Sequence, residues 1–298
     1  MKRRTFLTSA LLGAGAAVLP PQGQAEPIPS EKGALTAQTT EGPYYLGLDL
    51  MRADITEGHA GIPLDIVFTV TDAKGRPCTG SLVDVWHCNA QGSYSGFDGA
   101  ETGGRTKTTF LRGTQVVGAD GAVAFRSLYP GWYQGRTTHI HFKVRTGKLT
   151  NLTSQFFLPD TLSEFLYTQV SAYRRESLRD TLNSTDGIAI GAGTTVEGNV
   201  RESNGRYVAS LAVRVDPAAN PVVDRPPAPG QRPQGMAAMM PPPMDGHVPG
   251  QGAGRGMPMG PPHAKALEGE KRVAALLPDA ERISAMPPMG GPGMPPKA

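Results

Sequence analysis

Apolar and polar residues alternate along several short stretches of the chain, which is the pattern of half-buried β-strands. Turns rich in Asp and Gly, such as those at residues 72–75 and 119–121, separate these stretches. A single stretch, residues 163–178, repeats its apolar positions at helical spacing. The pattern predicts an all-β fold, a two-sheet β-sandwich with short helical insertions. The expected strands are residues 64–71, 81–87, around 123–125, 138–144, 152–158 and 208–215.

One predicted strand carries candidate chemistry. In His139-Ile140-His141-Phe142 the two histidines occupy alternate positions, so they project from one face while Ile140 and Phe142 project from the other. Neutral imidazole is a common metal ligand, and two imidazoles side by side suit a metal ion. The alternative is one ordinary histidine with a second one nearby by chance.

Residues before this pair strengthen the metal interpretation. Trp86-His87-Cys88-Asn89 leads into a turn followed by Tyr94, Tyr133 ends a Pro-Gly-Trp-Tyr turn, and Arg136 stands three residues before His139.

With these motifs, the chain resembles the intradiol ring-cleavage dioxygenases over about residues 39–215. The resemblance implies an Fe(III) cofactor with the ligands Tyr94, Tyr133, His139 and His141. Such a set of two tyrosinates and two neutral imidazoles has a charge of minus two and favours trivalent iron. Zinc more often takes Cys, His and carboxylate ligands, and ferrous oxygenases use two His and one carboxylate. It also implies that Tyr133 leaves the iron when a catechol binds, and that O2 is inserted between the two hydroxylated carbons to give a cis,cis-muconate. The Pro-Gly-x-Tyr position selects Tyr133 as a ligand and assigns Tyr129 to packing.

Three further segments match the family. Arg136 would place its guanidinium against the substrate ring, with an ordinary surface charge as the alternative. Gln155 would support it, unless it is simply an outward-facing strand residue. Residues 40–44 resemble a segment at the mouth of the active site, although a turn with packing tyrosines explains them equally well. Residues 180–188 also follow the family pattern.

The two ends of the chain differ from this predicted catalytic domain, which we place at residues 26–216. Residues 1–25 combine Arg3-Arg4, Phe6-Leu7 and a short apolar run, which predicts a twin-arginine signal peptide and a periplasmic or extracellular location. The run is too short to span a bilayer, so no membrane anchor is expected.

The C-terminal segment, residues 217–298, is rich in Pro, Gly and Met and is expected to be disordered, with a short helix at residues 264–277. Nine of the eleven methionines lie there, with His247 and His263 among them. Thioethers favour Cu(I), so a copper tether is one interpretation. A flexible extension is the interpretation we prefer, because no ligand spacing repeats.

Charge and cysteines limit the remaining functions. A net charge of +3 gives no reason to expect a nucleic-acid partner. About seven strand residues between Cys78 and Cys88 would hold their Cα atoms roughly 20 Å apart, so we expect two buried free thiols, although a fold-back of the chain would permit a disulfide.

Two other functions remain open at this point. An exported, non-enzymatic transthyretin-like or carbohydrate-binding sandwich would explain the strands but not the tyrosines and histidines. A copper protein would keep the metal and change its chemistry. The expected partners of the enzyme are a small catechol and O2; the sequence fixes neither the particular catechol nor the oligomeric state.

Overall fold

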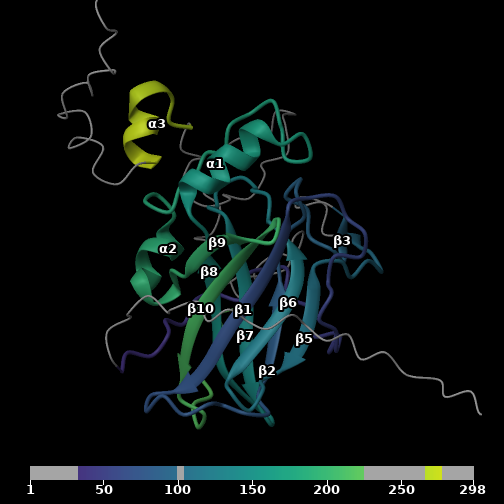
Figure 1. Cartoon of the computed structure of the whole chain (residues 1–298), viewed down its shortest axis with the longest axis vertical. Helices are drawn as coiled ribbons and strands as arrows, with labels where there is room; N and C mark the ends of the chain where they lie inside the picture. Colours follow the sequence, from purple (N-terminus) through teal and green to yellow (C-terminus); the bar gives the residue numbers. More distant parts are fainter. Residues whose placement is uncertain (1–32, 99–103, 225–265, 277–298) are drawn as a thin grey trace, which may run out of the picture.

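The computed structural model describes residues 33–98, 104–224 and 266–276. Two four-stranded sheets pack face to face and form a β-sandwich (Figure 1), which confirms the predicted fold class. The first sheet has the order β6 (Ala122–Leu128), β1 (Pro63–Asp72), β10 (Arg206–Val215), β9 (Asn199–Ser203). The second has the order β5 (Arg112–Val116), β2 (Leu82–Trp86), β7 (His139–Thr146), β8 (Leu149–Phe157). A small hairpin pairs β3 (Phe97–Asp98) with β4 (Gly104–Arg105).

The inner faces of the two sheets form the main core. Every second side chain of β1 is buried, as the sequence pattern predicts. Phe68 of β1 packs against Phe142 of β7, with ring centroids 4.9 Å apart, and against Phe156 of β8 at 6.2 Å. These aromatic contacts join the sheets beneath the strand that carries the histidines.

Strand β7 is buried on both of its faces. Ile140, Phe142 and Val144 enter the core, yet His139, His141 and Lys143 on the opposite face are also buried. Residues 39–45 cover that outer face: Thr39 donates from its backbone to Thr153 of β8, and Glu41 forms an ion pair with Lys143. The polar face of β7 therefore lies inside the molecule.

The helices differ from the predicted one. Helix α1 spans Asp160–Gln169, so it begins and ends earlier than the expected range of 163–178. The chain leaves the helix at Val170 because Tyr173 turns into the core and hydrogen-bonds the backbone at Ile62 and Tyr129. Helix α2 (Gly187–Ala192) and the 3-10 turn η1 (Gly193–Val196) were not predicted.

Two strands of the sandwich were not predicted from the sequence pattern. Strand β5 reads Arg-Gly-Thr-Gln-Val, and β9 reads Asn-Val-Arg-Glu-Ser, so neither alternates cleanly. Both lie at the edge of a sheet, where pairing with β2 and β10 holds them in place. Tertiary pairing thus decides their conformation.

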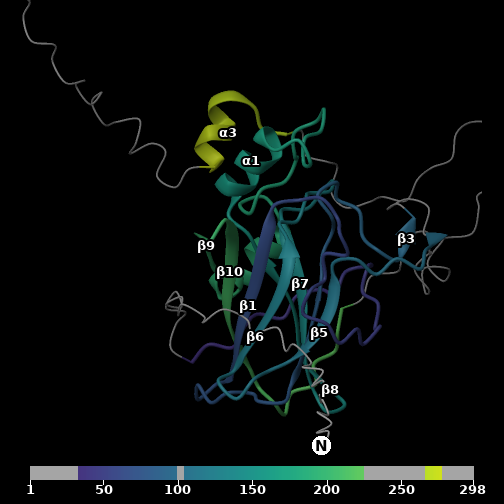
Figure 2. The same ribbon diagram turned by 45° about the vertical axis from the view of Figure 1, so that its right-hand side comes forward.

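Parts of the segment expected to be disordered are packed on the domain. The backbone carbonyls of Pro217 and Ala219 accept hydrogen bonds from Asn151. Helix α3 (Gly269–Leu276) lies beside α1 (Figure 2), within the range where a short helix was expected. The rest of this segment, like the predicted signal peptide, lies outside the described residues.

Cys78 and Cys88 are both buried and free, as expected. In the described part of the chain, no helix is both long enough and apolar enough to span a bilayer.

Phe142→Ala should lower the free energy of unfolding by about 3–5 kcal/mol, because it removes a fully buried ring between the sheets. Phe165→Ala, at a 56% exposed position of α1, is the matched control and should change the free energy little. Urea unfolding of both variants tests this, and equal losses would contradict the assigned core.

Candidate metal centre

The histidines belong to a row of side chains that crosses the second sheet. In the ladder, His141 pairs with Trp86 of β2 on one side and with Gln155 of β8 on the other, and Trp86 pairs with Arg112 of β5. The Trp86 indole stacks on the His141 imidazole at a centroid distance of 4.9 Å and an interplanar angle of 9°. His141 is thereby held by its neighbours along the row.

Four potential donor atoms meet at His139. Its Nε2 atom lies 3.1 Å from Nε2 of His141, 3.1 Å from the hydroxyl oxygen of Tyr133 and 3.5 Å from that of Tyr94. The structure thus brings together all four residues that the sequence analysis selected, although they come from a strand and two loops.

These distances suit a shared cation. Two donors about 2.1 Å from one ion, at a right angle, are about 3 Å apart. No group of three His, Cys, Asp or Glu side chains that fits a metal occurs in the part of the chain that the structure describes. The donor set depends on its two phenols, which as hard anionic oxygens fit ferric iron.

The tautomer of His139 is set by the backbone. Its Nδ1 atom lies 2.6 Å from the carbonyl oxygen of Thr137, so Nδ1–H donates and the lone pair of Nε2 faces the other donors. Burial, followed by the charge of Arg136, lowers the pKa of His139 to about 3. Burial also lowers the pKa of His141, so both imidazoles are neutral.

Tyr94 is buried and Tyr133 is partly buried, and burial raises the pKa of both phenols. Neither would ionise near neutral pH without a strong positive charge beside it. A bound cation is the group that supplies such a charge. The site therefore fits a metal that takes phenolate ligands.

The loops that carry the tyrosines are packed against each other through glycines. Asn89 caps the turn before Tyr94 by accepting from the backbone N–H groups of Gln91 and Ser93. A Cβ atom at Gly92 would lie 2.2 Å from the carbonyl oxygen of Trp132, and Gly92 has φ of +82°. Only glycine permits this approach, so the turn fixes Tyr94 relative to Tyr133.

Residues 40–44 form one wall of the site, in agreement with their suggested place at its mouth. The ring of Tyr44 stacks on Tyr94 at a centroid distance of 4.3 Å. A Cβ atom at Gly42 would lie 3.0 Å from Cε1 of His141. Sequence analysis did not select Tyr44 as a site residue; its place in this segment was the available signal.

Arg136 and Gln155 lie next to the centre and contact each other. Arg136 donates from Nη2 to the amide oxygen of Gln155, and Nε2 of Gln155 donates to the carbonyl oxygen of Thr40. Gln155 is fully buried, so it is not the outward-facing residue that was considered.

The buried carboxylate of Asp186 holds Arg136 and Thr137 in place. Its Oδ2 atom accepts from Nε of Arg136 at 2.8 Å and from the backbone N–H of Thr137 at 2.9 Å. Its Oδ1 atom accepts from two backbone N–H groups at the start of α2. The role of Asp186 was not predicted, although residues 180–188 had matched the family pattern.

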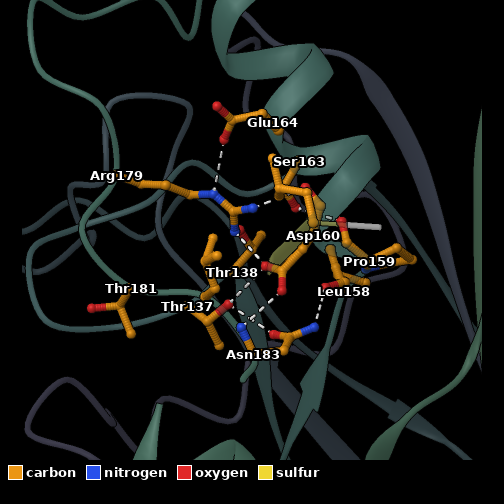
Figure 3. Close-up of polar contacts among 12 residues, drawn as sticks. Thr137, Thr138, Leu158, Pro159, Asp160, Ser163, Glu164, Arg179, Thr181 and Asn183 are labelled. Carbon is orange, nitrogen blue, oxygen red and sulfur yellow. Dashed lines mark hydrogen bonds and ion pairs between the residues drawn. The ribbon is translucent and has the colours of Figure 1, made fainter. Parts of the chain in front are cut away.

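A second polar network holds Thr137 from the other side (Figure 3). The Thr137 hydroxyl donates to Asn183, and the Asn183 backbone donates to Asp160, which forms an ion pair with Arg179. Since the carbonyl of Thr137 orients His139, both networks act on the metal centre.

Comparisons with known proteins agree with this geometry. Residues 40–178 match the model of the dioxygenase family described as "Dioxygenase". Catechol 1,2-dioxygenase 1 of Acinetobacter lwoffii is 32% identical over 182 residues, covering 52% of this chain and 56% of that protein. The chain thus spans about half the length of this curated relative. A catechol 1,2-dioxygenase of Acinetobacter baylyi is 29% identical over 217 residues, covering 64% and 67%.

A solved structure extends the match to the fold. The intradiol ring-cleavage dioxygenase from Tetranychus urticae is 28% identical, covers 63% of this chain and 97% of its own, and superposes with a TM-score of 0.59. The sandwich and its matched segment define a dioxygenase-type domain. Residues 40–178 thus match the dioxygenase family, and the chain is similar to intradiol ring-cleavage dioxygenases in sequence and in fold.

Asp186→Asn should lower the free energy of unfolding by about 3 kcal/mol, because it breaks a buried ion pair and leaves the Arg136 charge without its partner. Asp65→Asn breaks the half-exposed pair with Arg206 and should cost less than about 1 kcal/mol. Chemical denaturation distinguishes the two, and similar losses would refute the positioning role of Asp186.

His87 gives the metal-free protein a pH dependence. Burial lowers the pKa of His87 to about 4, and its two ring nitrogens are satisfied by the Cys88 carbonyl and Ser127. The unfolded chain takes up this proton near pH 6.5, so stability should fall as the pH drops from about 6.5 to about 4. His87→Gln should reduce the slope by about 1.4 kcal/mol per pH unit, and an unchanged slope in urea titrations would contradict this assignment.

Proposed function

We propose that this protein is a ferric intradiol dioxygenase that cleaves a catechol with O2 and gives a cis,cis-muconate-type product. The observation that carries the proposal is the convergence of two phenol oxygens and two imidazole nitrogens, with separations of 3.1–3.5 Å, at a buried position. The match of residues 40–178 to the dioxygenase family and the names of the relatives support the same reaction class.

Tyr94, Tyr133, His139 and His141 are the residues that would hold the iron. Ferric iron, when bound, supplies the Lewis acid that binds the catechol as its dianion and draws charge from the ring so that O2 can attack it. The other contributions come from the side chains of this chain.

Tyr133 is suited to be the ligand that leaves. It is only partly buried, whereas Tyr94 is 5% exposed and is pressed against Tyr44. Since burial raises the pKa of Tyr133, its phenolate would take up a proton once it is released from a cation. Tyr133 would thus accept one of the two protons that the catechol loses, and the other would pass to solvent.

Arg136 supplies fixed positive charge beside the site. Asp186 and Gln155 hold its guanidinium on two sides, so the charge is oriented before substrate binds. Preorganised charge of this kind stabilises negative charge that develops on a substrate ring. Trp86 and Tyr44 keep water from the imidazoles and phenols by covering them.

No comparable observation supports the two alternative functions, a non-enzymatic binding sandwich and a copper protein. A transthyretin-like binding sandwich has no need for four converging donors. A Cu(I) site built on methionine thioethers would draw on the methionine-rich segment, and its methionines lie outside the described residues.

We also propose that the protein is exported by the twin-arginine route to the periplasm or beyond. The support is Arg3-Arg4 with Phe6-Leu7 in the sequence. A metal centre assembled from loops and a strand suits a route that carries folded proteins.

Oxygen uptake by the iron-loaded protein across a panel of catechols, with identified products, tests the reaction. The wild type should consume O2 and yield the muconate product, and it should be red-brown because phenolate binds ferric iron. Tyr133→Phe and His141→Ala should each abolish turnover, and His141→Ala should also lose iron.

Tyr129→Phe is the matched control for Tyr133→Phe. Tyr129 is also a buried tyrosine, but it packs in the main core and bonds Ser163. This variant should keep its iron and its turnover. A colourless wild type that stays iron-free after reconstitution, or full activity in either ligand variant, would refute the proposal.

A further inference from the structure

A second cavity lies on the other side of the Tyr133 loop from the metal centre. It has a volume of about 180 Å³, which leaves room for a small organic molecule. Trp132, which precedes Tyr133, forms one wall and points into the main core cluster. Helix α1, helix α3 and residues 174–179 form the remaining walls.

The cavity is lined by four arginines and a single carboxylate, Glu164. Two of the arginines are neutralised within the protein. Arg272 of α3 forms a bidentate pair with Glu164. Arg179 pairs with Asp160 and Glu164 (Figure 3). Arg179 and Arg272 therefore line the cavity with their charges already paired.

The other two, Arg174 and Arg175, form no ion pair with any residue in the described ranges. Arg174 is exposed at the cavity rim. Arg175 is partly buried, lies over the Trp132 ring at 4.4 Å and donates from Nη2 to the Trp132 carbonyl. Its Nε atom is buried and has no hydrogen-bond partner among the described residues.

This arrangement leaves positive charge that no protein group offsets. A buried donor without an acceptor costs about 1–3 kcal/mol, so the contacts within the protein do not fully satisfy the Arg175 guanidinium. Burial also lowers the pKa of Arg175, as expected for a cation without an anionic partner. The cavity therefore suits an anion.

The walls limit which anion fits. A guanidinium presents a planar fork that matches a carboxylate in two parallel hydrogen bonds. The cavity is larger than an inorganic anion needs, and Leu178, which is 42% exposed, adds an apolar side chain to its lining. We propose that this cavity binds a small organic carboxylate through Arg174 and Arg175, with its apolar body against Leu178.

Titration calorimetry of the full chain with sodium benzoate, against sodium chloride at equal ionic strength, tests the proposal. The protein is used as purified and again after iron removal, because a carboxylate can also bind iron. Benzoate should bind in both forms with the same affinity. Arg174→Gln should weaken that binding about tenfold or more, since it removes a charge-assisted pair.

Lys148→Gln is the matched control. It removes one positive charge at an exposed turn that does not line the cavity, so binding should not change. Arg175→Lys keeps the charge but loses the buried Nε, and it should bind benzoate more weakly than the wild type.

Three results would overturn the inference. They are benzoate binding only with iron present, equal losses in Arg174→Gln and Lys148→Gln, or binding of sodium phosphate without binding of benzoate. None of them bears on ring cleavage, because the metal ligands are unchanged. Binding of adipate as well as benzoate would support a carboxylate site that does not require an aromatic ring.

Discussion

The structure depends on burying the polar face of one strand. His139, His141 and Lys143 all lie inside the molecule, where each polar group needs a partner. Lys143 is paired with Glu41, and Nδ1 of His139 bonds the Thr137 carbonyl. The Nε2 atoms of the two histidines face each other and the phenols, and Nδ1 of His141 is buried without a hydrogen-bond partner among the described residues. A cation satisfies this arrangement, so the requirement for burial and the capacity for a metal arise from the same strand.

Several other segments of the chain fix the positions of the histidines and tyrosines around that strand. Residues 39–45 cover the histidines, Asp186 and Asp160 fix Thr137 from two sides, and Gly92 lets the two tyrosine loops touch. Loops carry the two phenols and strand β7 carries the two imidazoles. The two sheets supply the rigid base, as is common among enzymes. The carboxylates of Asp186 and Asp160 do not touch the donor atoms, yet they set the position of the residue that orients His139.

The same loop links the metal centre to the arginine-lined cavity. Tyr133 faces the donors, while its neighbour Trp132 faces the core and accepts a hydrogen bond from Arg175. A carboxylate held by Arg175 would therefore lie next to Trp132. Trp132 directly precedes Tyr133, the residue that we propose leaves the iron. Helix α3, from the segment that sequence analysis expected to be disordered, contributes to the wall of that cavity through Arg272.

The sequence by itself determined the strand class of the fold, the shared face of His139 and His141, and the family motifs around Tyr94, Tyr133 and Arg136, because alternation and short motifs are local properties. It missed β5 and β9, whose conformation comes from pairing with neighbouring strands. It also placed the end of α1 nine residues late, because the contacts of Tyr173 that end the helix are with distant backbone. The role of Asp186, the cover provided by Tyr44 and the two unpaired arginines were decided only by the tertiary structure. Each is a relation between residues 40 or more positions apart, which no local pattern encodes.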